Sequence, residues 1–383
     1  MPRQLVLLDL EAGRSFVDAL QAAWEAGDAV APLDRRLPPV RRDEVISALR
    51  PGAVVDASGE RHTLAGGIPV EDGDALVVAT SGTTGSSRGV ILTHEALRCS
   101  ALATSERLGV DPGRDRWLAC IPLAHIGGLA VVTRSLLTGT PLVVHPRFDP
   151  QRTEAAAKEG ATLVSLVARA LHRVDPSLFR AILLGGSAYA GAVPDNVVIT
   201  YGMTETGSGV VYDGVPLDGV EVRVADGGEI LLRGPMLLRA YRDMSGDGTE
   251  RSRVAFRPDG WFATGDAGRL LADGRLEVDG RIADVIVTGG EKVWPTAVEG
   301  VLSAHPGIAE VAVVGRPDPD WGERVVAWIV PRRESSRSAP VTLDELRDLV
   351  AERIAPWARP SELVVVDALP RTASGKIRRT ALR

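Results

Sequence analysis

The sequence predicts an α/β protein with a large N-terminal part built on parallel sheets, a small β subdomain and a smaller α+β C-terminal domain. Up to about residue 210, apolar strand-like runs alternate with helical stretches, a pattern typical of parallel sheets covered by helices. Short strands separated by glycine turns follow, between about 210 and 280. The remaining part, 284–383, is large enough to hold its own core. We therefore place the N-terminal domain at 1–280 and the C-terminal domain at 284–383.

Each expected element follows from the local pattern of apolar, polar and turn residues. In the first half we expect strands at 5–8, 75–79, 117–121, 142–144, 162–167, 181–184 and 197–200. The helices expected there are 15–26, 42–49, 94–108 with Thr93 as its cap, 129–139, 151–159 and 168–174, and the Gly-, Asp- and Pro-rich stretch 51–73 is expected to be loop. In the second half we expect strands at 220–224, 229–232, 261–263, 269–271, 276–278, 285–287, 308–315, 324–331 and 363–366, helices at 296–305 and 342–354, and an exposed loop at 332–339.

Composition excludes several classes of function. The net charge of -6 and the pI near 5.7 argue against a general nucleic-acid-binding protein. Cys99 and Cys120 lack the spacing of a disulfide or metal site, which favours a reducing cytosol. No apolar run approaches the roughly 20 residues that a membrane helix needs, and the first residues do not resemble a signal peptide. The sequence therefore indicates a cytoplasmic protein with small-molecule partners, and a homo-oligomer stays open.

The stretch TSGTTGSSRGV, from Thr80 to Val90, follows a buried strand and holds three glycines, six hydroxyl residues and Arg88. Glycines let backbone N–H groups approach a ligand, hydroxyls add donors, and an arginine suits phosphate. These features predict a loop that wraps a polyphosphate, although the common P-loop pattern cannot be written here. The alternative is a Ser/Gly-rich hairpin turn or linker.

Other candidate residues follow strands or stand out by their charge. His125 lies at a strand-to-helix junction, where α/β sheets place ligand contacts, but it could equally be a structural loop histidine. Arg134 is a single charge in an apolar helix, and its alternative is a surface side chain that snorkels to water. Asp266 lies on a predicted turn at 264–266 and suits a ribose diol. For Lys376 the alternative is a basic tail, because Arg378 and Arg379 are close to it.

Taken together, these stretches resemble the adenylate-forming superfamily of acyl- and aryl-CoA synthetases, carrier-protein-loading adenylation domains and luciferases. Five motifs occur in the family's order: TSGTTGSSRG (80–89), GGSA (185–188) with YGMTET (201–206), WFATGD (261–266), GRIAD with GGEKVWP (280–295) and PRTASGKIRR (370–379). The resemblance implies ATP, Mg²⁺ and coenzyme A as cofactors. It also implies a mobile C-terminal domain that turns about a hinge at 281–283.

The resemblance also implies a role for each matching residue. The phosphates of ATP would contact Thr80, Ser81, Gly82, Thr83, Thr84, Gly85 and Arg88, and the adenine and α-phosphate would contact Gly185, Gly186, Ser187, Tyr201, Gly202, Met203 and Thr204. Asp266 and Arg281 would bind the ribose, Glu205 would bind Mg²⁺, and Lys376 would stabilise the charge that develops as the acid attacks. Gly289, Gly290 and Lys292 would line a pantetheine tunnel, His125 would gate it, and His125, Arg134, Gly202, Gly207 and Ser208 would contact the acid.

The chain departs from the family's pattern in three positions and in length. Arg88 stands where the family usually has Lys, and Ser87 where it usually has Pro. Ala283 occupies the position of the usual hinge Asp or Lys, so the hinge assignment stays open. The N-terminal part is also short for the superfamily.

The acid is the least determined part of the prediction. The compact chain, with the stretches 123–149 and 162–171, is similar to the o-succinylbenzoate–CoA ligases of menaquinone biosynthesis. In that family a basic residue at the position of Arg134 reaches the substrate's carboxylates, although the stretch VARAL lacks the polar P-T-Q of many relatives. The alternatives are a CoA ligase for another aryl or fatty acid, an enzyme that loads a carrier protein, and a nucleotide-binding regulatory protein without catalysis.

Overall fold

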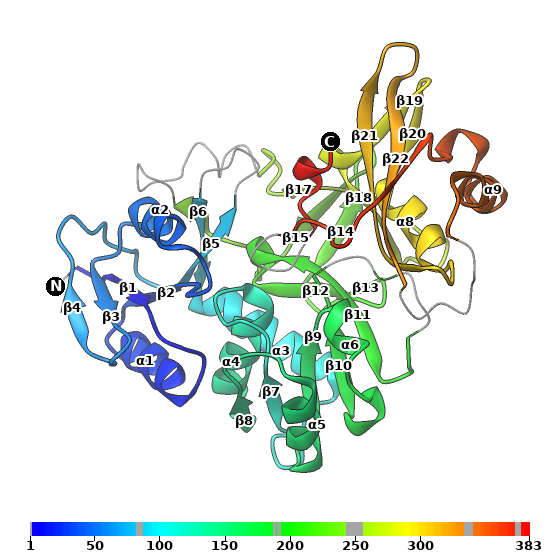
Figure 1. Ribbon diagram of the computed structural model, residues 1–383. Coiled ribbons are helices and arrows are strands. Elements are labelled where there is room, and N and C mark those ends of the chain that lie inside the picture. The colour runs from blue at the N-terminus through cyan, green and yellow to red at the C-terminus, as the bar shows by residue number, and fades with distance from the viewer. Residues whose placement is uncertain are drawn as a thin grey trace. The chain divides into compact units, whose positions relative to one another are not determined.

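The computed structural model describes residues 2–81, 87–186, 189, 193–242, 256–332, 340–371 and 377–383 (Figure 1). The chain divides into two compact units. The first comprises Met1–Gly186, Pro194–Val222 and Leu231–Ala263, and the second comprises Ser187–Val193, Arg223–Ile230 and Thr264–Arg383. Parallel strands with helices between them confirm the predicted α/β class. No helix in the described part of the chain is long and apolar enough to cross a membrane.

The first sheet of the first unit has the strand order β16-β6-β5-β2-β1-β3-β4. Its strands are β1 (Leu5–Leu8), β2 (Ala29–Pro32), β3 (Ala53–Val55), β4 (Arg61–Thr63), β5 (Asp74–Ser81), β6 (Ser87–Thr93) and β16 (Ala240–Arg242). The expectation that 51–73 is all loop is wrong, because β3 extends the sheet beside β1 in parallel and β4 pairs with β3. Helices α1 (Arg14–Glu25) and α2 (Pro39–Leu49) accompany these strands (Figure 1).

The second sheet of this unit has the order β13-β12-β11-β10-β9-β7-β8. Its parallel strands are β7 (Trp117–Ala119), β8 (Leu142–Val144), β9 (Leu163–Leu166), β10 (Ala181–Leu184) and β11 (Val197–Met203), and β12 (Ser208–Tyr212) and β13 (Val215–Pro216) are antiparallel. Its helices are α4 (Ile126–Thr138), α5 (Pro150–Lys158) and the short α6 (Ala168–Leu171). The expected loop 201–207 starts as the end of β11, because Gly202 pairs with Gly209 of β12.

Helices α3 (His94–Leu108) and α4 pack against each other, with α3 against the first sheet and α4 against the second. The Thr93 hydroxyl accepts a hydrogen bond from the Ala96 N–H at 3.1 Å, which confirms the predicted cap of α3. The packed pair of helices joins the two sheets, so that residues of both sheets meet in one unit.

A four-stranded sheet has the order β14-β15-β17-β18, with β14 (Glu221–Val224), β15 (Glu229–Arg233), β17 (Phe262–Leu270) and β18 (Leu276–Arg281). The expected strands 261–263 and 269–271 and the expected turn 264–266 are one continuous strand, β17. Gly265 with φ of 70° and a register shift between Ala267 and Gly268 bend this strand instead of ending it.

The second unit holds a five-stranded sheet of β19 (Ile286–Thr288), β20 (Glu291–Val293), β21 (Ile308–Asp318), β22 (Gly322–Pro331) and β23 (Glu362–Val365). Helices α8 (Pro295–Ser303) and α9 (Leu343–Arg353) pack on it through Val298, Leu302, Leu346 and Val350. The two long strands β21 and β22 form an antiparallel hairpin that stands out in Figure 1. Most of the expected loop 332–339 lies outside the described residues.

Candidate active site

The predicted phosphate-binding stretch is the connection between two antiparallel strands. Thr80 of β5 pairs with Arg88 of β6, and Ser81 pairs with Ser87. The phosphate-binding loop and the hairpin turn, which were alternatives for this stretch, are therefore compatible. The flanking strands form a hairpin whether or not the connection between them binds phosphate. Gly82, Thr83, Thr84 and Gly85 lie outside the described residues, as does Ser187, and their predicted contacts stay predictions.

Gly89 has a structural role in the packing of its strand. A Cβ atom at Gly89 would lie 2.5 Å from Val77 Cγ1 and 2.6 Å from Leu49 Cδ2. Gly202 is similar, because its Cβ would lie 2.2 Å from the carbonyl oxygen of Ser208. Both glycines therefore serve the close packing of the strands that carry the candidate site.

Glu205, the predicted Mg²⁺ ligand, lies in a short 3-10 turn (Thr204–Thr206) between β11 and β12, and its side chain is 11% exposed. Its Oε1 accepts a hydrogen bond from the Tyr241 hydroxyl at 3.0 Å and from Arg88 Nη2 at 3.4 Å. Arg88 also stacks on Tyr241, with its Cζ 4.1 Å from the ring centroid. The structure thus brings two predicted residues together around a third that was not predicted.

Buried Thr206 shapes the turn that carries Thr204 and Glu205. Its hydroxyl accepts from the Met203 N–H at 2.9 Å and donates to the Ser208 carbonyl at 2.6 Å. Gly207 ends the turn with φ of 68°, a conformation that glycine adopts without strain. Thr204 and Ser208 are half-buried on either side of it.

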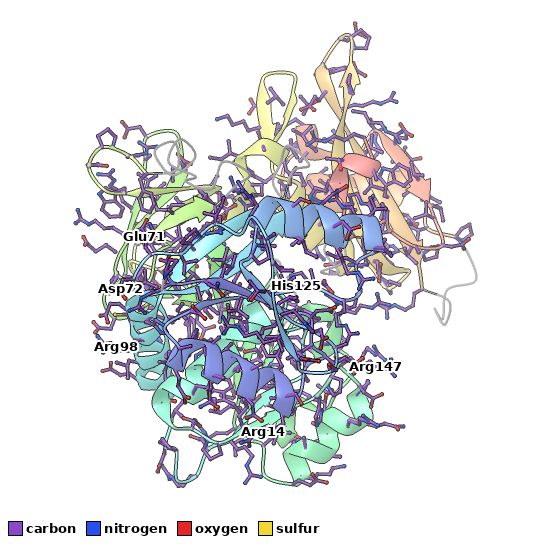
Figure 2. All side chains as sticks on the ribbon, turned by 90° about the vertical axis from the view of Figure 1, so that its left-hand side faces the viewer. Arg14, Glu71, Asp72, Arg98, His125 and Arg147 are labelled. Carbon is purple, nitrogen blue, oxygen red and sulfur yellow. The ribbon has the colours of Figure 1, made fainter. Side chains whose placement is uncertain are left out.

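His125 directly precedes α4 (Figure 2). Its side chain is 36% exposed. Its Nε2 lies 3.0 Å from Arg36 Nη2 and 3.3 Å from Asp34 Oδ2. The Nε2 atom can either accept from Arg36 or donate to Asp34, and the tautomer of the ring determines which of these two hydrogen bonds forms. Burial raises the pKa of Asp34, but hydrogen bonds from His125 and Arg36 outweigh it and hold that pKa well below its ordinary value.

Arg134 is only 2% exposed, and this burial excludes the alternative of a snorkelling surface side chain. Its Nη2 donates to Ser208 Oγ at 3.1 Å, and its Cζ lies 5.0 Å from the ring centroid of Trp117. Its Nε and Nη1 are buried and have no hydrogen-bond partner among the described residues. Burial lowers the pKa of Arg134, which reflects the cost of keeping a guanidinium out of water. A buried cation with two unused donors is suited to an anionic ligand.

The second unit carries the residues predicted for the ribose. Arg281 Nε of β18 lies 2.8 Å from Oδ1 of buried Asp266, which belongs to β17. The two residues face each other in the β17–β18 register, and the Asp266 N–H donates to Thr264 Oγ1 at 3.0 Å. The structure therefore brings the predicted pair together on a strand, although the sequence predicted a turn.

Gly289 and Gly290 form the turn between β19 and β20, with φ of 58° and 84°. A Cβ atom at Gly289 would lie 2.7 Å from Trp321 Cε3, so the turn packs closely on that ring. Lys292 follows in β20 and is exposed.

Two of the residues predicted to contact the adenine and α-phosphate, Gly185 and Gly186, directly follow β10. A Cβ atom at Gly185 would lie 2.8 Å from Thr200 Oγ1.

Lys376 lies outside the described residues, but both flanks of its segment are held by ion pairs. Before it, Arg371 Nη2 lies 2.8 Å from Glu310 Oε2. After it, Arg379 contacts both carboxylate oxygens of Glu299, at 2.7 and 2.9 Å. Burial raises the pKa of Glu299, and the charge of Arg379 opposes that shift.

We expect Glu299→Ala to lower the free energy of unfolding by about 3 kcal/mol, because it leaves the half-buried Arg379 guanidinium without its bidentate partner. Urea unfolding measures this change. The double variant Glu299→Leu with Arg379→Met removes both charges and should recover part of the loss. If the double variant were at least as unstable as Glu299→Ala, the pair would not have this role.

Sequence reasoning missed four residues that contact the predicted site residues. They are Tyr241, Asp34, Arg36 and Trp117. Asp34 closely follows an apolar run, 29–33, and a carboxylate at the carboxyl end of a strand could have indicated a site. For Tyr241 the sequence holds no such signal, since β16 has only three residues and pairs with β6, which lies about 150 residues earlier in the chain.

The fold and these clusters define an AMP-binding enzyme, and the chain belongs to that family. The family model for the AMP-binding enzyme matches residues 67–242, and that for the AMP-binding enzyme C-terminal domain matches residues 297–376. Within the family, the chain is 40% identical over 384 residues to a probable 2-succinylbenzoate–CoA ligase of Mycobacterium tuberculosis, which covers 93% of this chain and 96% of the relative.

Solved structures give the same result. The o-succinylbenzoate CoA synthetase (MenE) of Bacillus subtilis in complex with ATP and magnesium matches 99% of this chain and 89% of its own, with a TM-score of 0.84 and 30% identity. The same protein with the acyl-adenylate intermediate OSB-AMP matches 99% and 88%, with a TM-score of 0.81 and 28% identity. The resemblance identified from the motifs is therefore confirmed.

Proposed function

We propose that this chain is an AMP-forming acid–CoA ligase that converts o-succinylbenzoate to o-succinylbenzoyl-CoA in menaquinone biosynthesis, in the cytosol. A carboxylate of the acid attacks the α-phosphorus of ATP and pyrophosphate leaves. The thiol of coenzyme A then attacks the carbonyl of the acyl-adenylate, and AMP leaves. The names of the relatives support this reaction, with ATP, Mg²⁺ and coenzyme A as its small-molecule partners.

The burial of Arg134 is the observation that supports a dicarboxylate as the acid substrate. A dicarboxylate keeps one charged carboxylate after the other has been activated. Arg134 offers two buried donor atoms without partners among the described residues, beside Ser208 and on the face of Trp117. An acid without a second carboxylate would leave this cation uncompensated, which is costly in a buried site.

The main requirement of adenylation is that the enzyme stabilises the negative charge of the triphosphate. We assign Arg88 to the phosphates, Thr204 to the α-phosphate and Lys376 to the charge that develops during attack. Among the described residues no three His, Cys, Asp or Glu side chains gather as a metal site. Glu205 as a single buried carboxylate fits Mg²⁺, which usually takes its remaining ligands from phosphate oxygens and water, and which would neutralise phosphate charge.

Other residues are assigned to the ribose and to the second step. Asp266 with Arg281 would hold the ribose. His125, which Asp34 and Arg36 hold at the start of α4, would gate the path of the thiol. Gly289, Gly290 and Lys292 would meet the pantetheine after the C-terminal domain turns about the hinge that we propose at 281–283.

The test is pyrophosphate release over a panel of acids, with and without coenzyme A, followed by mass spectrometry of the product. We expect release with o-succinylbenzoate and a thioester only when coenzyme A is present. Release with a different aryl or fatty acid, and not with o-succinylbenzoate, would identify that acid as the substrate. Formation of the adenylate without transfer to coenzyme A would favour a carrier protein as acceptor. ATP binding without release for any acid would favour a regulatory protein.

A further inference from the structure

We propose that Tyr241 is a positioning residue for adenylation, which holds Arg88 and Glu205 where they meet the triphosphate and its Mg²⁺. This inference rests on the proposed function of the same site. Tyr241 is the residue that touches both predicted groups by two different kinds of contact, one through its hydroxyl and one through its ring.

The hydroxyl sets the orientation of the Glu205 carboxylate. It donates to Oε1 at 3.0 Å, whereas Arg88 reaches the same oxygen at the longer distance of 3.4 Å. A carboxylate turns freely about its last bond unless a donor fixes it. With both of these contacts on Oε1, the hydroxyl determines which way the carboxylate is presented to a cation.

The ring sets the position of the Arg88 guanidinium. Its Cζ lies 4.1 Å from the ring centroid, well within the range of a cation–π interaction. The buried Nε of Arg88 has no hydrogen-bond partner among the described residues, so the guanidinium is held mainly by the ring and by Glu205. This leaves it with donor capacity for phosphate oxygens.

The backbone around Tyr241 is itself fixed. Tyr241 is 3% exposed and lies opposite Val90 in the β16–β6 register, two residues from Arg88 on the same face. The next residue, Arg242, donates to the carbonyl oxygens of Leu49 at 2.7 Å, of Pro69 at 3.1 Å and of Arg50 at 3.2 Å. These bonds tie the short strand to the rest of the unit, so Tyr241 is a rigid support.

Two substitutions separate the two contacts. Tyr241→Phe keeps the ring and removes the hydroxyl, so we expect binding of ATP with Mg²⁺ to weaken about tenfold while binding of ATP without Mg²⁺ stays unchanged. Tyr241→Leu removes the ring as well, and we expect ATP binding to weaken with and without Mg²⁺. Isothermal titration calorimetry of the full chain measures both affinities without turnover.

A double-mutant cycle of Tyr241→Phe and Glu205→Gln tests whether the Tyr241 hydroxyl acts through Glu205. In the Glu205→Gln background, Tyr241→Phe should no longer change the effect of Mg²⁺ on ATP binding. Tyr212→Phe is the matched control, because it removes another buried tyrosine hydroxyl, 3.1 Å from Thr104 Oγ1, and should leave the effect of Mg²⁺ as it is.

The inference fails if Tyr241→Phe binds ATP with Mg²⁺ as tightly as the unmodified chain, or if Tyr212→Phe weakens this binding as much. It also fails if the effect of Tyr241→Phe persists in the Glu205→Gln background. Failure of the proposed function has a different signature. In that case no acid releases pyrophosphate from the unmodified chain, whatever the calorimetric result for Tyr241→Phe.

Discussion

Replacement of Arg134 by methionine should lower kcat/KM for o-succinylbenzoate about 100-fold, which corresponds to about 3 kcal/mol. The guanidinium is buried, and we propose that its Nε and Nη1 donate to the carboxylate that is not activated. Methionine has a similar length and no charge, so the variant would place that carboxylate in an apolar site without a counter-ion.

The control for Arg134→Met is a monocarboxylic analogue that lacks the second carboxylate. We expect the variant to use this analogue about as well as the unmodified chain does, so that the preference for the dicarboxylate disappears. Arg134→Lys keeps a positive charge but not the forked donors of the guanidinium. Its kcat/KM for o-succinylbenzoate should lie between those of Arg134→Met and the unmodified chain. Equal losses for both acids would show that Arg134 supports the fold alone, and no loss would exclude it from the acid site.

Replacement of Lys376 by alanine should lower the rate of adenylation about a thousandfold, because a positioned cation that stabilises developing charge is worth about that much. The role of Lys376 rests on its motif, since it lies outside the described residues. What the structure adds is that Arg371 and Arg379 hold the flanks of this segment through Glu310 and Glu299.

The two half-reactions provide the measurement. Pyrophosphate release reports adenylation, and formation of the thioester from a supplied acyl-adenylate reports the second step. We expect Lys376→Ala to spare the second step, because we propose that the C-terminal domain turns about the hinge and presents another face for it. Loss of both steps to the same extent would contradict the proposed use of two orientations. Arg378→Ala is a suitable comparison, as it removes a neighbouring positive charge.

The sequence determined features that depend on neighbouring residues. Thr93 caps α3 as predicted and Gly139 follows α4 in a left-handed conformation, because each is set by hydrogen bonds or backbone sterics within one turn. The order of the motifs identified the family for the same reason, since each motif is a local loop chemistry. The apolar runs also placed most strands, because burial on both faces of a parallel sheet leaves a continuous apolar pattern.

Only the tertiary structure decided which polar groups are buried and what they contact. The sequence left Arg134 between a surface and a substrate role, and burial against Trp117 and Ser208 decided against the surface. It predicted a turn at Asp266, whereas pairing with β18 extends β17 through that residue. It could not bring Tyr241 to Arg88 and Glu205, because strand register and desolvation arise from residues that are far apart in the chain.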